Sequence, residues 1–409
     1  MKVEIGNFIS FKFDRESLLT LLICVVWASM LFTFARGIIN RLPVLGDHTE
    51  AIIVIVTVTA IVMAVPSLIN KFCLADYLFF FALVFYYVAN YVFFPDNAPF
   101  LTENAYMCLC CVFPYYFIGR VIDIDKLFNL FVLLSVVCIY MDLFYYLVYS
   151  PGNKVVDSKE TYDNMYTAYQ SLPHVTMLMW ATLRKFSIFK AVTTLLGILF
   201  LFSCGTRGTL VCLGFFTIIY FLFYMNFKGA IYVKSVIVAV VLVTVAFLKE
   251  IAVYLFGVFT NFNLSTRIIE KFVYGDLGND TQRGALRDII YKTLESGDYP
   301  LGMGVFGSVT RYNFYAHFLP LDLASTFGFI IASIILLLLF LLIGRAYWAA
   351  NDKITREFIL FTFSISIIKL MFSSTFLLEP FFFLLIGICV RILIIRRMSS
   401  PVYYSVEQK

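Results

Sequence analysis

The sequence predicts an all-α polytopic membrane protein, and three bulk properties carry that prediction. Of the 409 residues, 61% are hydrophobic and only 14% are charged, and the mean hydropathy is +0.90. Soluble globular proteins usually contain about 25% charged and about 45–50% apolar residues. Apolar runs that could form a spanning helix of roughly 20 residues recur along the whole chain. This composition excludes a water-soluble enzyme, a nucleic-acid-binding protein and a disordered scaffold.

Polar residues divide these apolar runs into about 12 predicted transmembrane helices. Residues 1–257 hold the first nine, a large polar loop follows at 258–313, and residues 314–409 hold the last three and a tail. The predicted spans are approximately 17–39, 51–70, 73–94, 104–119, 127–149, 171–183, 187–204, 208–226, 234–257, 314–344, 356–377 and 379–396.

The distribution of lysine and arginine predicts that both termini face the cytoplasm. When the N-terminus is placed there, most basic residues outside the large loop fall on loops of the same side, among them Lys71, Arg120 and Arg184. An even number of spans agrees with this orientation. Two loops then face outward, one at about 150–170 and the large one at 258–313.

The large outer loop contains signals for a helix. Loops longer than about 12–15 residues in compact folds are usually functional or disordered. Here Asp280 or Thr281 can cap the start of a helix, and Gly297 can end it. Apolar residues at i, i+4 and i+8 give this helix one stripe to bury: Leu286, Ile290 and Leu294. We therefore expect a helix over 281–297 that docks against the membrane domain.

Three arginines lie at the predicted outer face and could bind a phosphorylated ligand. Arg207 occupies a turn between two apolar helices, and Arg283 and Arg287 are one turn apart on the predicted loop helix. The planar guanidinium group binds phosphate oxygens in bidentate fashion and stays charged when it is partly desolvated. The alternative is that Arg207 reaches to the membrane interface and that the helix pair only solvates its own face.

His317 is the candidate general base, because a histidine side chain is mostly neutral near neutral pH. Its alternative role is that of a ring at the membrane interface, and the same role is expected for His174. Asp322 lies five residues after His317 and could orient a sugar hydroxyl or pair with an arginine. Ionisable groups at membrane depth are costly, so each of them is a functional candidate.

Lys369 lies near the middle of a predicted span, which makes it the most costly charge in the chain. It should pair with an acid or line a polar cavity, and its role is otherwise left open. A coupling-ion role would favour a transporter. The candidate partners are Glu379, Asp76 and Asp142.

The sequence predicts no metal site and no cofactor. The closest cysteines, Cys108, Cys110 and Cys111, lie inside an apolar span, where cysteine behaves as a small hydrophobic residue. A zinc site would combine such thiolates with histidines at ligand spacing, and the chain contains only 3 histidines.

Together these features resemble the O-antigen polymerase and O-antigen ligase families of bacterial inner membranes, and the Wzy-type polymerases most of all. The shared features lie within about residues 203–330, and the layout of spans extends the similarity over the full length. The sequence departs from the family pattern at Phe318, where an Asn usually follows the histidine. The motifs are Thr206-Arg207-Gly208, an arginine-bearing helix, Pro300-x-Gly302-x-Gly304, Tyr315-Ala316-His317 and Phe327-Gly328.

The resemblance implies a GT-C-like membrane glycosyltransferase that acts on undecaprenyl-diphosphate-linked sugars at the periplasmic face of the inner membrane. It implies a metal-independent reaction that inverts the anomeric carbon. His317 and Arg207 would be catalytic. The residues expected to bind diphosphate or substrate are Arg283, Arg287, Arg311, Asp322, Gly302 and Gly304.

Three functions remain open at this point. A polymerase would join lipid-linked repeat units, whereas a ligase would transfer the same glycan to lipid A–core. The partners expected for a polymerase are inner-membrane lipids, the flippase and the chain-length regulator of the same pathway. A flippase or transporter of lipid-linked sugars would instead place charges along a path through the membrane and would need only a small outer loop.

Overall fold

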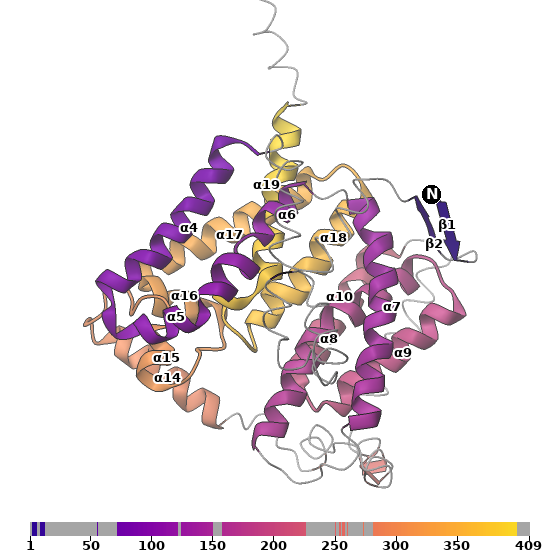
Figure 1. Ribbon diagram of the computed structural model, residues 1–409, viewed down its shortest axis with the longest axis horizontal. Coiled ribbons are helices and arrows are strands. Elements are labelled where there is room, and N and C mark those ends of the chain that lie inside the picture. Colours follow the sequence, from indigo (N-terminus) through magenta and orange to yellow (C-terminus); the bar gives the residue numbers. More distant parts are fainter. Residues whose placement is uncertain are drawn as a thin grey trace, which may run out of the picture. The chain divides into compact units, whose positions relative to one another are not determined.

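The computed structural model describes residues 2–5, 9–12, 72–121, 124–149, 158–225 and 281–398, with isolated residues at 55, 250, 253, 254, 256, 257, 260 and 273 (Figure 1). The described chain is helical apart from one antiparallel hairpin, β1 (Lys2–Ile5) with β2 (Ile9–Lys12). The predicted spans 17–39, 51–70 and 234–257 lie outside the described residues, apart from isolated positions.

The chain forms two compact units, which are described separately. Unit 1 comprises residues 1–59 and 127–280, and unit 2 comprises residues 60–126 and 281–409. Both units are discontinuous in sequence. The predicted division of the chain at 257/258 falls within unit 1, next to residues that are not described.

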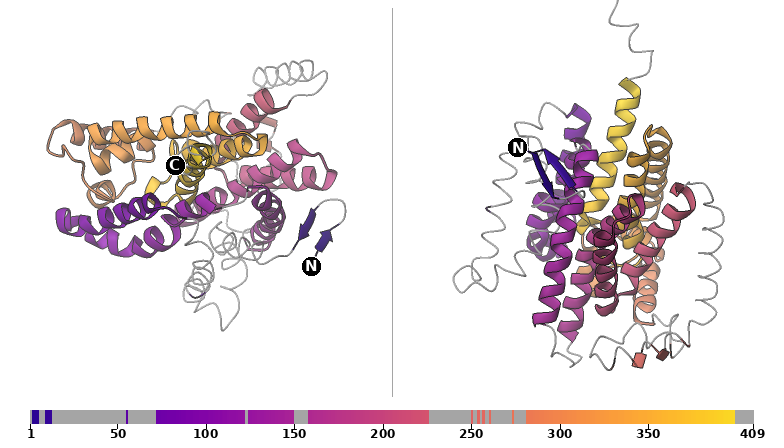
Figure 2. Two further views of the ribbon diagram at one scale, coloured as in Figure 1. Left: turned by 90° about the horizontal axis from the view of Figure 1, so that it is seen from above. Right: turned by 90° about the vertical axis from the view of Figure 1, so that its right-hand side faces the viewer.

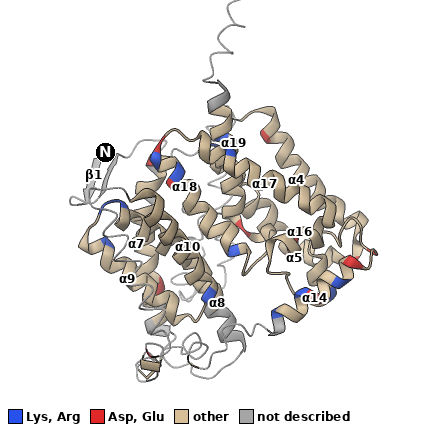
Figure 3. Cartoon of the chain, turned by 180° about the vertical axis from the view of Figure 1, so that it is seen from behind, with Lys and Arg blue, Asp and Glu red and all other residues tan. Residues whose placement is uncertain are grey.

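Several described helices are long and apolar enough to cross a membrane. Four meet both criteria: Leu74–Phe93, Leu127–Phe144, Arg207–Tyr224 and Phe329–Ala349. Two shorter helices, Ile188–Ser203 and Pro380–Ile395, are also apolar. The charged residues, blue and red in Figure 3, lie mainly near helix ends, which leaves long uncharged stretches between them. These helices indicate a helical membrane protein.

Helix α4 (Leu74–Phe93) shows the polarity expected for a membrane solvent. Its exposed face is an apolar stripe at i, i+4, i+7 and i+11, from Leu74 through Leu78 and Phe81 to Phe85. Its buried face carries Asp76, which has no exposed surface. In water this arrangement would leave a large apolar surface unsatisfied. In hydrocarbon it places the apolar side chains against lipid and the carboxylate inside the protein.

Unit 2 is built from two separate stretches of helices. Among its packing pairs are α6 with α19, α16 with α17, α17 with α19, and α14 with α16. In chain order its elements are α4, η4 (Pro95–Asn97), α5 (Ala98–Tyr106), η5 (Met107–Val112), α6 (Tyr115–Val121), α14 (Thr281–Glu295), α15 (Gly307–Tyr312), α16 (Leu319–Phe327), α17 (Phe329–Ala349), α18 (Lys353–Phe363), η6 (Ser364–Ile368), η7 (Phe376–Leu378) and α19 (Pro380–Met398).

The predicted span 104–119 is wrong as a single helix. The chain passes from α5 through the π-helical segment η5 and restarts as α6 after Pro114. Proline has no amide hydrogen and its ring clashes with the preceding turn, so it breaks the helix at this point. The short α6 then packs closely on α19, where a Cβ on Gly119 or Gly387 would meet backbone of the other helix.

The predicted span 314–344 is also wrong as one helix, because it is divided at Gly328. Residues 314–318 are not helical, α16 follows, and α17 starts after Gly328, which has φ +81°. A Cβ on Gly328 would collide with the carbonyl group of Pro300. The break therefore accommodates the loop that carries the Pro300-x-Gly302-x-Gly304 motif.

The predicted span 356–377 is confirmed as helical up to Leu370 and is wrong beyond it. α18 continues into the π-helical segment η6, and the helical run ends in a turn after Leu370. The segment 369–375 leads to the 3-10 turn η7 and then to α19, which confirms the predicted helix at 379–396.

Unit 1 contains four described helices: α7 (Ile124–Tyr149), α8 (Ser158–Arg184), α9 (Ile188–Ser203) and α10 (Arg207–Tyr224). α8, α9 and α10 pack against one another (Figure 2). The predicted outer loop at 150–170 is wrong from residue 158 onward, because α8 begins there. Thr167 and Ser171 are buried, so packing of small polar side chains lengthens this helix beyond its apolar part.

Candidate functional site

The predicted loop helix exists and docks within unit 2. α14 covers Thr281–Glu295, and Gly297 follows it with φ +83°, which suits the end of a helix. Ile290 and Leu294 are buried as predicted. α14 packs against α16, so the helix that carries the arginine pair lies beside the segment that follows His317.

Arg287 binds the backbone of the loop that carries His317. Its Nη2 donates to the carbonyl oxygen of His317 at 2.7 Å, and its Nε donates to that of Ala316 at 3.2 Å. The guanidinium carbon also lies 5.6 Å from the centroid of the Phe318 ring. One arginine therefore fixes three successive residues of this loop. Phe318, the residue that departs from the family pattern, lies with its ring against the guanidinium group of Arg287.

His317 adopts an unusual backbone conformation, with φ +48°. The residue is half-buried and its Nδ1 atom is buried. The ring lies 4.9 Å from the Phe314 ring in an edge-on arrangement, and 5.9 Å from the Tyr315 ring. Left-handed conformations cost a non-glycine residue about 1–3 kcal/mol and are typical of functional sites. The two bonds from Arg287 hold this loop and offset part of that cost.

Arg283 binds a second loop. Its Nη1 donates to the carbonyl oxygen of Phe372 at 3.1 Å. Phe372 belongs to the segment 369–375 between η6 and η7, in which Ser374 has φ +68°. Within the described residues, no carboxylate lies within 4.0 Å of Arg283. A carbonyl group can orient a guanidinium but does not supply a compensating negative charge.

Strained backbone is concentrated in this part of unit 2. In the described chain, the non-glycine residues with positive φ are Phe306, Asn313, His317 and Ser374. His317 and Ser374 lie in the two loops that the arginines of α14 contact. Asn313 ends α15, immediately before the His317 loop. The three predicted residues Arg283, Arg287 and His317 are thus brought together around two strained loops.

Asp322 is buried and makes contacts that the sequence did not predict. Its Oδ2 accepts hydrogen bonds from Thr375 Oγ1 at 2.7 Å and from the backbone N–H of Phe376 at 3.1 Å. Only 4% of the residue is exposed. These bonds connect α16 to the end of the segment 369–375. Asp322 is therefore bound to protein groups of the second loop.

Gly302 and Gly304 have a structural reason for being glycine. Both have positive φ, +80° and +81°. A Cβ on Gly302 would lie 2.6 Å from the backbone N of Gly328, and one on Gly304 would lie 2.5 Å from Oδ1 of Asn90. Gly302 therefore packs backbone to backbone against the Phe327-Gly328 break, whereas Gly304 packs against the side chains of Asn90 and Phe94. The expected contribution of both glycines to substrate binding stays a prediction.

Two further predicted arginines belong to elements other than α14. Arg311 is exposed, and its guanidinium carbon lies 4.4 Å from the centroid of the Tyr299 ring. Arg207 is the first residue of α10 in unit 1, after a turn in which Gly205 has φ +73°. The predicted tight turn is confirmed, and Thr206, the residue before α10, has its hydroxyl 2.9 Å from that of Thr209. The roles of both arginines stay predictions.

The predicted buried charges have partners. Lys369 pairs with Glu379 at 2.5 Å, and Glu379 has no exposed surface. Asp142 accepts a hydrogen bond from Ser171 on α8 at 2.5 Å. The prediction that His174 is an interfacial ring is wrong. Because α8 starts at residue 158, His174 lies inside the helix and is fully buried, with Nδ1 3.3 Å from Ser135 Oγ.

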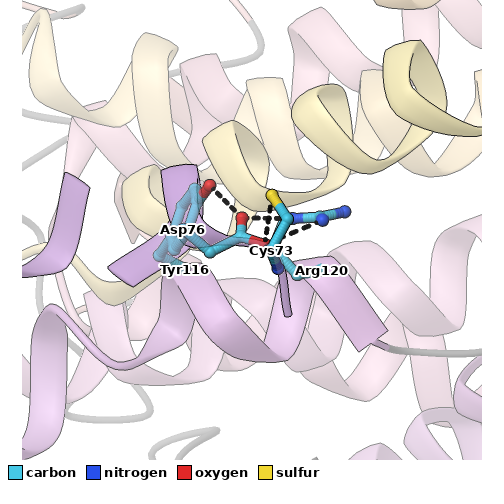
Figure 4. Close-up of polar contacts among 4 residues, drawn as sticks. All are labelled: Cys73, Asp76, Tyr116 and Arg120. Atoms are coloured by element: carbon cyan, nitrogen blue, oxygen red, sulfur yellow. Dashed lines mark hydrogen bonds and ion pairs between the residues drawn. The ribbon is translucent and has the colours of Figure 1, made fainter. Parts of the chain in front are cut away.

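Asp76 anchors a second polar cluster of unit 2, which contains no predicted site residue (Figure 4). Arg120 binds its two oxygens, Nε to Oδ1 at 2.5 Å and Nη2 to Oδ2 at 2.9 Å. Tyr116 donates to Oδ1 at 2.6 Å, and the backbone N–H and thiol of Cys73 donate to Oδ2 at 2.9 and 3.2 Å. The carboxylate thereby ties the start of α4 to the end of α6.

Sequence reasoning missed the segment 369–375 as a part of the site. The polar run Ser373-Ser374-Thr375, which interrupts an apolar stretch, was the available signal. A continuous helix over 356–377 would have left these hydroxyl groups within the membrane span.

Comparisons with models of protein families, with curated proteins and with solved structures find no match.

Proposed function

We propose that the protein is an O-antigen polymerase, which joins undecaprenyl-diphosphate-linked repeat units at the periplasmic face of the bacterial inner membrane. The observation that carries the proposal is the bond from Arg287 to the carbonyl of His317. It places a candidate base and a fixed cation on adjoining segments, next to Arg283 one turn away on α14. Base and cation are the two groups that transfer from a lipid diphosphate requires.

The leaving group determines which side chains the reaction needs. Undecaprenyl diphosphate is already a stable anion, so it departs without a general acid. Positive groups that are fixed before the reaction stabilise the charge that builds up on the bridging oxygen. Arg283 and Arg287 suit this role because their orientation is set by backbone carbonyls. For Arg207, in the Thr-Arg-Gly turn of unit 1, the catalytic role implied by the resemblance stays an expectation.

His317 takes the acceptor proton in this mechanism. As the ring removes the proton, the hydroxyl oxygen of the acceptor sugar attacks the anomeric carbon of the donor. The bond from that carbon to the diphosphate oxygen breaks, and the electron pair leaves with undecaprenyl diphosphate. Direct displacement inverts the anomeric carbon, and no metal takes part. The glycan grows by one repeat unit in each step.

The wider architecture belongs to the same proposal. About 12 helices in a GT-C-like arrangement, with both termini in the cytoplasm, would hold α14 and the His317 loop at the periplasmic side. The inner-membrane flippase would supply the lipid-linked unit, and a chain-length regulator would limit the polymer. The several apolar helices support the membrane location.

The test uses the purified full chain in detergent and a synthetic undecaprenyl-diphosphate-linked repeat unit, with and without lipid A–core. The proposal expects a ladder of multiples from the lipid-linked unit alone. Transfer that requires lipid A–core would make the protein an O-antigen ligase. If neither product forms while a known polymerase is active in the same assay, the transporter alternative becomes the better reading.

A further inference from the structure

The segment 369–375 is fixed to the rest of unit 2 at three points. Lys369 pairs with Glu379 at the start of the segment. Arg283 donates to the carbonyl of Phe372 in its middle. Thr375, at its end, donates to Asp322. A short loop held at both ends presents its middle carbonyl at a defined place.

We propose that Asp322 is a positioning residue for Arg283. It acts through Thr375 and the segment 369–375, which contains the Phe372 carbonyl that Arg283 binds. The proposal rests on the proposed function, because the ligand of Arg283 is taken to be the lipid diphosphate. It assigns Asp322 a different role from the sugar contact suggested by the sequence. Its carboxylate accepts hydrogen bonds from Thr375 and from the N–H of Phe376, and only 4% of the residue is exposed.

The backbone of the segment explains why such an anchor is needed. Ser374 has φ +68°, a conformation that a non-glycine residue leaves unless neighbouring bonds hold it. The N–H groups of Phe372 and Ser373 both turn back to the carbonyl of Lys369, at 3.0 and 2.9 Å. The Phe372 carbonyl that Arg283 binds therefore belongs to a tight turn. Release of Thr375 would let Ser374 relax and would move this carbonyl away from Arg283.

Thr375 offers a matched pair of variants. Its hydroxyl donates to Asp322 and accepts from the N–H of Leu377 at 3.4 Å. Thr375→Val keeps the shape and removes both bonds, whereas Thr375→Ser keeps the hydroxyl. Asp322→Asn keeps an acceptor oxygen but removes the charge that strengthens both of its bonds.

The experiment measures the Kd of undecaprenyl diphosphate for the purified full chain, and KM and kcat for the lipid-linked unit. Thr375→Val should raise Kd and KM about tenfold with a smaller change in kcat, because a hydrogen bond that orients a charged group is lost. Thr375→Ser should restore both values to within about twofold. Asp322→Asn should fall between these two variants.

A double-mutant cycle with Arg283→Ala decides whether the effect passes through the arginine. Once Arg283 is removed, Thr375→Val should change Kd by less than about twofold. Equal effects of Thr375→Val with and without Arg283 would contradict the positioning role, as would wild-type affinity in Thr375→Val alone. A wild-type protein that neither binds undecaprenyl diphosphate nor elongates the glycan would instead contradict the proposed function, on which this role depends.

Discussion

Arg120 and Arg283 belong to the same unit, yet their surroundings differ in charge and in backbone regularity. Arg120 binds both oxygens of Asp76 and lies on a regular helix. Arg283 binds the neutral carbonyl of Phe372, in a loop that includes the strained Ser374. The charge of the first arginine is compensated by a carboxylate at a buried position. The second is oriented by a neutral group, and among the described residues no carboxylate pairs with it.

This difference separates a structural cation from a candidate binding cation. A buried carboxylate–guanidinium pair is stable only as a pair, because either partner alone would be an uncompensated charge. A guanidinium held by carbonyls adds a positive potential to its surroundings. The residue type is the same in both places, so only the partner distinguishes the two roles. Four sets of variants test whether the two arginines and their surroundings differ in this way.

The largest effect is expected at the candidate base. His317→Ala should lower the rate of glycan transfer by about 10²–10⁴-fold, the usual contribution of a positioned base. The quantity of folded protein, read from size-exclusion profiles in detergent, should stay at the wild-type level because the residue is only half-buried. Transfer at more than half the wild-type rate would remove His317 from the mechanism.

The next effect concerns folding rather than activity. Arg120→Ala should destabilise the protein by about 3–5 kcal/mol, because it leaves the carboxylate of Asp76 buried without its counterion. The double variant Asp76→Leu with Arg120→Met should recover much of this loss. Thermal unfolding in detergent measures both. Wild-type stability of Arg120→Ala would show that this cluster is not structural.

Arg287→Lys should lower transfer about tenfold while the protein stays folded. The ammonium group of lysine is a compact donor and cannot reproduce the fork that reaches the carbonyls of Ala316 and His317 together. Kinetics with the lipid-linked unit would show the loss in both KM and kcat, since the His317 loop also loses a support. Unchanged kinetics would mean that a single charge is sufficient at this position.

The smallest effects come from a pair of glycines with opposite expectations. Gly302→Ala should destabilise by about 1–3 kcal/mol, because φ is +80° and the added Cβ would meet the backbone at Gly328. Gly284→Ala, on α14 with nothing within 4 Å of its Cβ, should stabilise by up to about 1 kcal/mol. Thermal unfolding of both variants tests the proposed backbone contact. Equal responses would contradict it.

The sequence predicted what depends on local periodicity. The helix of the large loop is confirmed from residue 281, together with its buried residues Ile290 and Leu294 and its end before Gly297. The turn before Arg207 is confirmed as well. In each place, neighbouring residues alone determine the structure. The partner of Lys369 was among the three predicted acids, since a charge at that depth must be paired.

Features that depend on contacts between distant residues were not predictable in the same way. The break at Gly328 is required by Pro300, 28 positions earlier, and the bonds of Asp322 go to residues 53 and 54 positions later. A hydropathy pattern does not indicate the break at Gly328, because the segments on both sides of it are apolar. The arginines could be named from the sequence, but their carbonyl partners could not, because every residue carries a carbonyl.

The proposed mechanism requires that the His317 loop, held by Arg287, takes part in sugar transfer from a lipid diphosphate. The most direct measurement is the undecaprenyl diphosphate released from the lipid-linked repeat unit per mole of folded protein, compared between wild type and His317→Ala. The account predicts release by the wild type in step with glycan growth, and at least a 100-fold slower release by the variant, at the lower end of what a positioned base contributes, about 10²-fold. Equal release by the two proteins, or none by either, would contradict it.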